Sequence, residues 1–230
     1  MSLAIQIFGI LGAILVASLG IPQLFKIIKD KKTGDVNFLS FWIFHTGILL
    51  WVLWSAFSAN NLHNVLAANG ITLVTESVML YLMYKYKIEF DRKQKLIGQG
   101  AVALYLILGF IFIGLHIAIY TTDNLKNLTW PSSAETTMGF VFPAFTTLAF
   151  LPQFIQSIKT NKWGGLSYGM FIIYITNNFV WIIWWALLII SSSQTAQGVD
   201  MSYVGGIIWQ LISFSLFSTQ FIFTIKNTKR

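Results

Sequence analysis

One stretch of the chain occurs twice. A proline-glutamine pair at 22–23 recurs 130 residues later, at 152–153, and in both copies tryptophans follow at the same two distances. The identical positions of the first copy are Pro22, Gln23, Ile28, Lys29, Lys32, Gly34, Phe41, Ile43, Thr46, Trp51, Trp54 and Ala56. Their counterparts are Pro152, Gln153, Ile158, Lys159, Lys162, Gly164, Phe171, Ile173, Thr176, Trp181, Trp184 and Ala186. A period this long indicates a duplicated supersecondary unit and not a solenoid.

The composition indicates a membrane protein. Of the 230 residues, 56% are hydrophobic and 10% are charged, which is too apolar for one soluble domain of this length. Seven apolar segments alternate with short polar connectors, and each segment is long enough to cross a core of about 30 Å as a helix. They cover residues 4–28, 38–58, 65–86, 96–120, 136–158, 166–192 and 203–225. The absence of cysteine excludes disulfides and thiolate metal sites.

Basic residues gather at alternate connectors. Of the 15 Lys and Arg residues, only Lys126 falls outside this pattern. The others are Lys26, Lys29, Lys31, Lys32, Lys85, Lys87, Arg92, Lys93, Lys95, Lys159, Lys162, Lys226, Lys229 and Arg230. Because short basic loops stay in the cytosol, the distribution predicts a multi-pass protein of the cell membrane with its N-terminus outside and its C-terminus in the cytosol. It also accounts for the formal charge of +7 without a nucleic-acid partner.

This topology relates the two copies. Both proline-glutamine helices run from outside to inside, so two three-helix units need an odd helix between them. We expect an all-α integral membrane protein: a first triple-helix bundle over 1–88, an inverting linker helix within 89–130, and a second bundle over 131–230 in parallel orientation. The apolar N-terminus lacks a basic region, so we expect a retained first helix and not a cleaved signal.

Together these features resemble the SWEET and PQ-loop transporter superfamily. The resemblance covers nearly the whole chain and rests on the proline-glutamine positions, the tryptophan positions and the charge topology. It implies a membrane carrier that moves a small solute by alternating access around a pocket between the bundles. It also implies a substrate-binding asparagine in the third helix of each bundle. Asn69 fits this role, but matching Asn69-Gly70 to Gly205-Gly206 leaves no asparagine in the second copy, where Gln210 lies nearby.

The duplicated prolines are predicted to be hinges. Pro22 and Pro152 fall inside predicted helices, about one turn from the cytosolic end. Proline removes a backbone donor and crowds the carbonyl four residues back, which kinks a helix. A static kink is the alternative, but the same device occurs in both copies. We expect Gln23 and Gln153 to bond the freed carbonyls or each other at an inner gate.

The duplicated tryptophans are predicted to line a shared pocket. Trp51 and Trp54 are three residues apart and share a helix face, and the second copy offers Trp181 and Trp184 with Asn177. Core packing is the alternative for Trp51 and Trp181, and interfacial belts are the usual place for tryptophan. Flat aromatic faces suit sugar rings and heteroaromatic rings alike.

Glu76 is the one carboxylate deep inside a predicted span. A charge there costs about 2.5–3.5 kcal/mol, so the side chain should face protein or water and be protonated unless it is paired. Ile212 is its expected counterpart in the second copy. His45 is the plausible cationic neighbour, from an adjacent helix. The functional interpretation is proton coupling or direct substrate contact, and the alternative is a structural carboxyl group.

The sequence therefore favours a transporter of a small polar solute, foremost a sugar, working as a uniporter or coupled to protons. A vitamin or nucleoside carrier similar to the PnuC family, with a substrate of the nicotinamide riboside kind, stays open. So does a non-transporting membrane receptor. No nucleophile–base arrangement, phosphate-binding glycine loop or metal-ligand cluster is visible, so we expect no enzyme, metal or cofactor. The expected partners are the substrate, the lipid bilayer and, as an open option, a second copy of the chain.

Overall fold

Every regular element of the computed structural model is a helix within the residues it describes, which are 2–34, 36–60, 62–122, 125, 128–163, 166–196 and 198–228. Gly164, Lys126, Lys229 and Arg230 lie outside these residues. The helices are α1 (Ser2–Ser18), α2 (Ile21–Asp30), α3 (Phe38–Ala56), α4 (His63–Tyr86), α5 (Arg92–Thr121), α6 (Ser132–Leu148), α7 (Leu151–Thr160), α8 (Tyr168–Ser193) and α9 (Met201–Thr228). They form seven spans long and apolar enough to cross a membrane, which confirms the predicted fold class.

Two of the spans are broken helices. The first runs from Ser2 to Asp30 through α1 and α2, and the fifth from Ser132 to Thr160 through α6 and α7. Pro22 and Pro152 were expected inside continuous helices, but each lies in the first turn of the second piece. That position tolerates proline because the first N–H groups of a helix have no partner within it.

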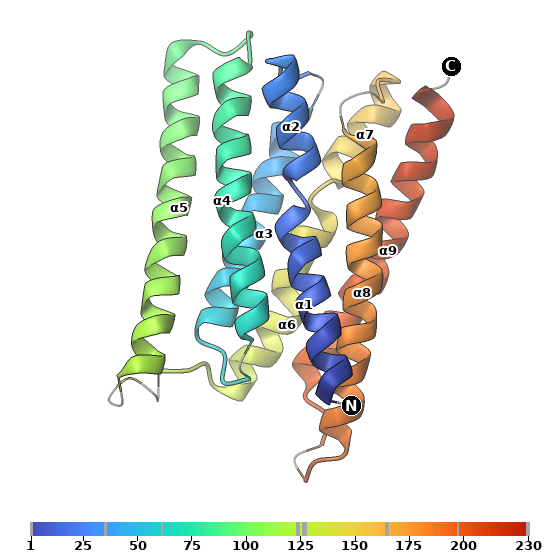
Figure 1. Ribbon diagram of the computed structural model, residues 1–230. Helices are drawn as coiled ribbons and strands as arrows, with labels where there is room; N and C mark the ends of the chain where they lie inside the picture. The colour runs from blue at the N-terminus through green and yellow to red at the C-terminus, as the bar shows by residue number, and fades with distance from the viewer. Residues whose placement is uncertain are drawn as a thin grey trace.

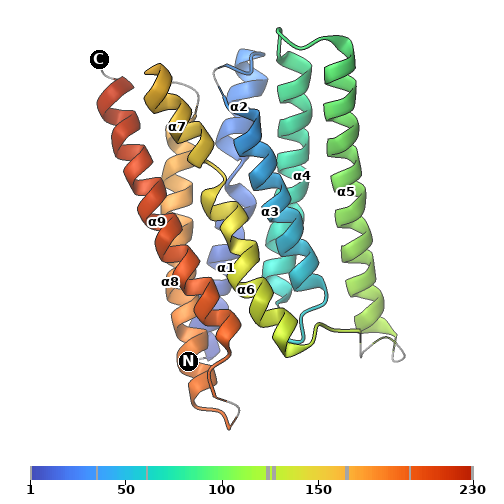
Figure 2. The same cartoon turned by 180° about the vertical axis from the view of Figure 1, so that it is seen from behind.

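The helices form a ring with one helix outside it. Helix α4 packs between α1 and α3, and α9 packs between α8 and α6. The two groups meet where α1 contacts α8 and where α3 contacts α6, while α5 packs against α3 and α4 (Figures 1 and 2). The space enclosed by the ring is therefore lined by both copies of the repeat.

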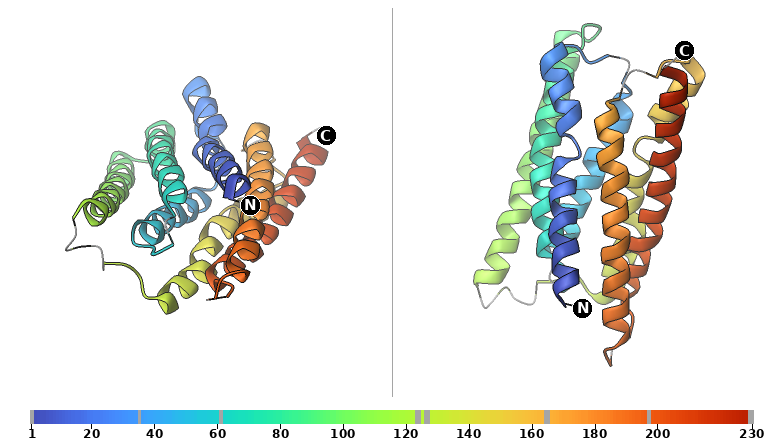
Figure 3. Two further views of the ribbon diagram at one scale, coloured as in Figure 1. Left: turned by 60° about the horizontal axis from the view of Figure 1, so that its bottom comes forward. Right: turned by 45° about the vertical axis from the view of Figure 1, so that its right-hand side comes forward.

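The two chain ends lie at opposite ends of the molecule (Figures 1 and 3). We call the end at which α1 begins the N side and the end at which α9 finishes the C side. Large apolar side chains such as Leu3, Ile107 and Ile222 are more than one-third exposed along the outer surface. An apolar belt of this kind is what a bilayer-spanning protein presents to lipid.

Candidate functional site

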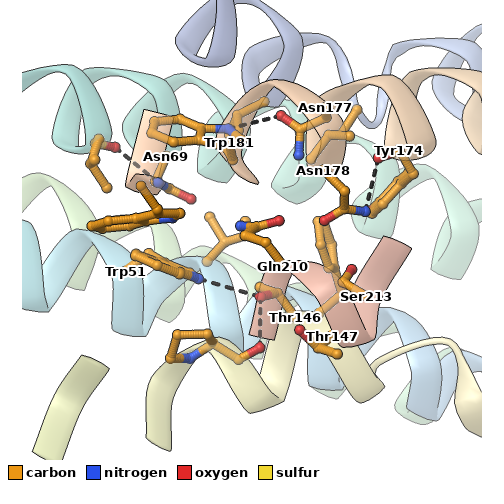
Figure 4. A pocket seen from close by; sticks show the side chains of 17 residues that line it. Trp51, Asn69, Thr146, Thr147, Tyr174, Asn177, Asn178, Trp181, Gln210 and Ser213 are labelled. Atoms are coloured by element: carbon orange, nitrogen blue, oxygen red, sulfur yellow. Dashed lines mark hydrogen bonds between the residues drawn. The ribbon is translucent and has the colours of Figure 1, made fainter. Parts of the chain in front are cut away.

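A closed cavity lies between the two groups of helices (Figure 4). It leaves about 60 Å³ for the centres of water-sized molecules. Because a cavity of about 150 Å³ is what holds benzene, this one has to widen before a sugar-sized ring can enter. It is lined by Val16, Leu19, Phe44, Ile48, Trp51, Val65, Asn69, Pro143, Thr146, Thr147, Tyr174, Asn177, Asn178, Trp181, Trp185, Gln210 and Ser213.

Two tryptophans from the two copies stand in this wall, each held by a hydrogen bond. Trp51 Nε1 donates to Thr146 Oγ1 over 3.3 Å, and Trp181 Nε1 donates to Asn177 Oδ1 over 3.0 Å (Figure 4). Trp181 also packs closely on Gly12, where an added Cβ would lie 2.7 Å from its ring. The aromatic faces are therefore fixed before any ligand arrives.

The polar side chains of the cavity have defined free ends. Asn69 and Asn178 each donate their amide N–H, over 2.9 Å, to a backbone carbonyl four residues back. A carbonyl only accepts, so both amide oxygens remain free as acceptors. Asn177 has the opposite polarity, because its oxygen accepts from Trp181 and its NH₂ stays available. Gln210 adds a buried Oε1 without a partner, and the cavity can thus bind hydroxyl groups as donors and as acceptors.

Five of the predicted substrate-binding residues line the cavity and two do not. Trp51, Asn69, Asn177, Trp181 and Gln210 are in its wall. The remaining two, Trp54 and Trp184, lie behind the first layer: Trp54 is fully buried beside the Trp51 ring, and Trp184 donates to the Ile5 carbonyl.

Several polar lining residues were not predicted, namely Thr146, Thr147, Tyr174, Asn178 and Ser213. Two of them carried a usable signal. Asn178 directly follows the predicted Asn177, and Ser213 lies three residues after Gln210, on the same helix face. Thr146 and Thr147 come from α6, where no duplicated residue marks the inward face.

The structure corrects the register in which the third helices were matched. Ile212, the expected counterpart of Glu76, is 39% exposed on α9. The residue that packs at the second helix break is Phe217, whose ring centroid lies 5.9 Å from that of Phe150. Phe150 is the counterpart of Gly20 at the offset of 130 residues. The residue that corresponds to Glu76 is therefore Phe217, five positions later.

This register also places the counterpart of Asn69. Gln210, and not Gly205, lies in the cavity with Asn69. Gly205 instead contacts the backbone of Gly139 on α6, and Gly206 contacts the ring of Trp185. These two glycines serve close helix packing, since an added Cβ would lie under 3 Å from the neighbouring atoms.

Glu76 lies outside the cavity lining, at the break between α1 and α2. It is 1% exposed, its Oε1 contacts Gly20, and its Oε2 has no hydrogen-bond partner. The Tyr174 hydroxyl is close enough for an electrostatic interaction with this carboxyl group. The one ion pair within 4 Å among the described residues joins Lys87 to Glu89, so Glu76 has no salt bridge there.

His45 faces a different neighbour from the expected one. It is fully buried, its Nε2 lies 3.4 Å from Ser77 Oγ, and its ring stacks on Tyr105. His45 is not part of the cavity lining. Glu76 and Ser77 are adjacent on α4, so they point to different faces of the helix, and the expected pairing of His45 with Glu76 is wrong.

The duplicated glutamines tie the two groups of helices together on the C side. Gln23 Oε1 accepts from the Ser167 backbone N–H over 3.2 Å, and Gln153 Oε1 accepts from the Asn37 N–H over 2.6 Å. Asn37 and Ser167 are themselves 130 residues apart, so each glutamine reaches the equivalent position of the other copy. The expected partners, freed carbonyls or the other glutamine, were wrong for these oxygens, because an amide oxygen accepts and does not donate.

A carboxylate makes the corresponding link on the N side. Glu135, at the start of α6, accepts from the Ala59 N–H over 2.7 Å, from Ser58 Oγ over 3.2 Å and from Asn60 Nδ2 over 2.7 Å. Asn60 also donates to Asp200, before α9. These residues were not predicted, because a polar side chain near a helix end gives no signal of its distant partner. Both ends of the cavity are thus closed by hydrogen bonds between the two copies.

Comparisons with known proteins agree with this architecture. A family model described as PQ loop repeat matches residues 4–64. Over 71 residues the chain is 32% identical to the sugar transporter SemiSWEET of Bradyrhizobium diazoefficiens, a match that covers 31% of this chain and 83% of that protein. The solved 3.7 Å structure of a eukaryotic SWEET transporter matches 95% of this chain and 97% of its own, with a TM-score of 0.55 at 17% identity. At that identity the structural match supports the fold alone.

Proposed function

The chain belongs to the SWEET and PQ-loop transporter superfamily and is not an enzyme, and on this premise we propose that it carries a sugar across a membrane by alternating access. The similar SemiSWEET protein is named as a sugar transporter. A carrier needs a binding site between two parts that can separate at either end, and the cavity between the two copies has this position.

The fixed lining of the cavity is the observation that carries the choice of substrate. Trp51 and Trp181 offer aromatic faces, and Asn69, Asn177 and Asn178 offer free amide groups of both polarities. A sugar ring has apolar C–H faces and a rim of hydroxyl groups that donate and accept. Such a molecule packs on an aromatic face while its rim pairs with amides.

Alternating access follows from the links at the two ends. Opening the C side separates Gln23 from Ser167 and Gln153 from Asn37, whereas opening the N side separates Glu135 from the α3–α4 connection. The broken helices give each copy a place to bend, because the breaks at Pro22 and Pro152 interrupt the backbone hydrogen-bond ladder. Following the basic residues, the N side faces the outside and the C side the cytosol.

Glu76 is the candidate for coupling transport to protons. Its buried carboxyl group has one oxygen without a partner and contacts the α1–α2 break at Gly20. Any movement at this break changes the surroundings of the carboxyl group. A proton bound in one conformation and released in the other would then accompany the sugar.

A nucleoside or vitamin carrier is the second candidate, because the two tryptophans and the amide groups also suit a heteroaromatic ring. A thermal-shift screen of the purified protein against sugars, nucleosides and vitamins separates the two, since a ligand of the folded state raises its melting temperature. Counterflow in proteoliposomes then tests transport of each hit. Stabilisation and counterflow by nucleosides but by no sugar would replace the sugar proposal.

A further inference from the structure

Two of the three histidines meet on the N side, away from the cavity. His63 is exposed at the start of α4, and His116 is buried near the end of α5. Helices α4 and α5 lie side by side (Figures 1 and 2). His63 Nδ1 and His116 Nε2 are 3.2 Å apart. The third histidine, His45, is fully buried elsewhere in the bundle.

The tautomer of neutral His116 is fixed by a backbone carbonyl. His116 Nδ1 lies 2.7 Å from the carbonyl oxygen of Ala56, the last residue of α3. Because this oxygen only accepts, Nδ1 carries the hydrogen and neutral His116 has its lone pair on Nε2. That lone pair faces His63. Histidines that bind metals usually donate their other ring N–H to a carboxylate, backbone carbonyl or water in the same way.

The spacing of the two facing nitrogens also fits one metal ion. Zinc binds imidazole nitrogen at about 2.0–2.1 Å, so two nitrogens of a tetrahedral site lie about 3.3 Å apart. The observed separation is 3.2 Å. Without metal, His63 Nδ1–H donates to His116. When the His63 hydrogen moves to Nε2, both facing nitrogens become available for an ion that enters from the exposed side.

We propose that His63 and His116 form a two-histidine site for a divalent transition ion such as Zn²⁺ or Cu²⁺, with water in the remaining positions. Imidazole suits both ions. Among the described residues no group of three or more potential ligands is present, so binding should be weaker than at a structural zinc site with four protein ligands. A bound ion would join the start of α4 to the end of α5, next to the last carbonyl of α3.

Copper binding to the full-length protein, purified without a histidine tag, tests the site. We expect one Cu²⁺ per chain with an electron paramagnetic resonance spectrum split by two imidazole nitrogens. Zn²⁺ should raise the melting temperature by roughly 3–6 °C at tenfold excess over its Kd. H63A removes an exposed side chain and should lose both effects, as should H116A, while H45Q is the control that keeps them.

The possible results decide the matter in both directions. A two-nitrogen spectrum that disappears in H63A and persists in H45Q supports the site. No binding by the wild-type protein, or a spectrum unchanged in H63A, overturns it. Because H116A also deprives Ala56 of its hydrogen bond, a misfolded H116A protein leaves the decision to H63A. None of these measurements depends on transport.

Discussion

Replacing Gln153 by alanine should open the cavity toward the C side. In the closed form Gln153 Oε1 accepts from the backbone N–H of Asn37 over 2.6 Å. The Gln153→Ala variant leaves this buried N–H without its partner, at a cost of about 1–3 kcal/mol. In the open form the N–H is hydrated, so the cost falls on the closed form alone. The equilibrium then shifts by about 5- to 150-fold toward the open form.

The other glutamine should matter less. Gln23 Oε1 accepts from Ser167 N–H over a longer distance, 3.2 Å. The Gln153 side also has a bond from its own backbone N–H to Ser40 Oγ, over 3.0 Å, which aligns α7 with the start of α3. A single neutral hydrogen bond contributes about 0.5–1.5 kcal/mol. We therefore expect Gln23→Ala to shift the equilibrium about 2- to 13-fold.

The absence of cysteine makes the assay direct. Ser213→Cys places one thiol in the cavity wall, where Ser213 is 6% exposed. A membrane-impermeant maleimide, applied to intact cells and to inverted vesicles, reports access from each side. Gln153→Ala should increase labelling from the C side more than Gln23→Ala does. Thr160→Ala is the control on the same helix, because the Thr160 hydroxyl bonds only to its own helix turn at Gln156.

Two outcomes would refute this reasoning. Equal labelling of Gln153→Ala and Thr160→Ala would mean that the glutamine bond does not hold the C side closed. A larger effect of Gln23→Ala than of Gln153→Ala would contradict the ranking based on distance and on the additional Ser40 bond.

Three further predictions use the same carrier. Glu135→Ala should increase labelling of the cavity thiol from the N side at least tenfold, because hydrogen bonds to a charged group contribute about 1.5–3 kcal/mol each; unchanged labelling would exclude a role in closing that side. Glu76→Gln should abolish the pH dependence of net sugar uptake and preserve sugar exchange, and a wild-type pH profile would make Glu76 structural. Trp181→Ala should weaken sugar binding, measured by thermal shift, whereas Trp54→Phe should not, because Trp54 Nε1 has no hydrogen bond to lose; equal loss in both would reduce Trp181 to a packing residue.

The seven spans could be predicted from the sequence because a bilayer allows few alternatives. An apolar segment of some twenty residues must pair its own backbone groups, so it becomes a helix whatever its neighbours are. The segment 38–58 accordingly forms α3 from Phe38 to Ala56, and 65–86 lies within α4. The helix breaks were predictable for a similarly local reason, since proline lacks the backbone donor. Tryptophans at a constant offset then aligned the second helices of the two copies.

The match between the third helices could not be predicted in the same way. Helices α4 and α9 share no duplicated residue that marks a position, and a shift of five residues still keeps apolar residues opposite apolar residues. Contacts at the helix breaks decide the register, through Gly20 with Glu76 and Phe150 with Phe217. The layer behind the cavity was equally hidden. Trp51 and Trp54 share a face, but three residues turn a helix by about 300°, so their rings diverge by about 60° and only Trp51 reaches the cavity.

The two copies differ most where they would have to act differently. At the C side both glutamines bond the equivalent backbone N–H of the other copy, so opening there treats the copies alike. At the helix breaks the symmetry is lost: the first holds Gly20 against a carboxyl group, and the second holds Phe150 against the Phe217 ring. A titratable group at both breaks would bury two carboxyl groups at once and would cost about twice the insertion energy of one. With one, a single proton per cycle can bias one copy while the apolar copy provides a fixed packing surface for it to move against.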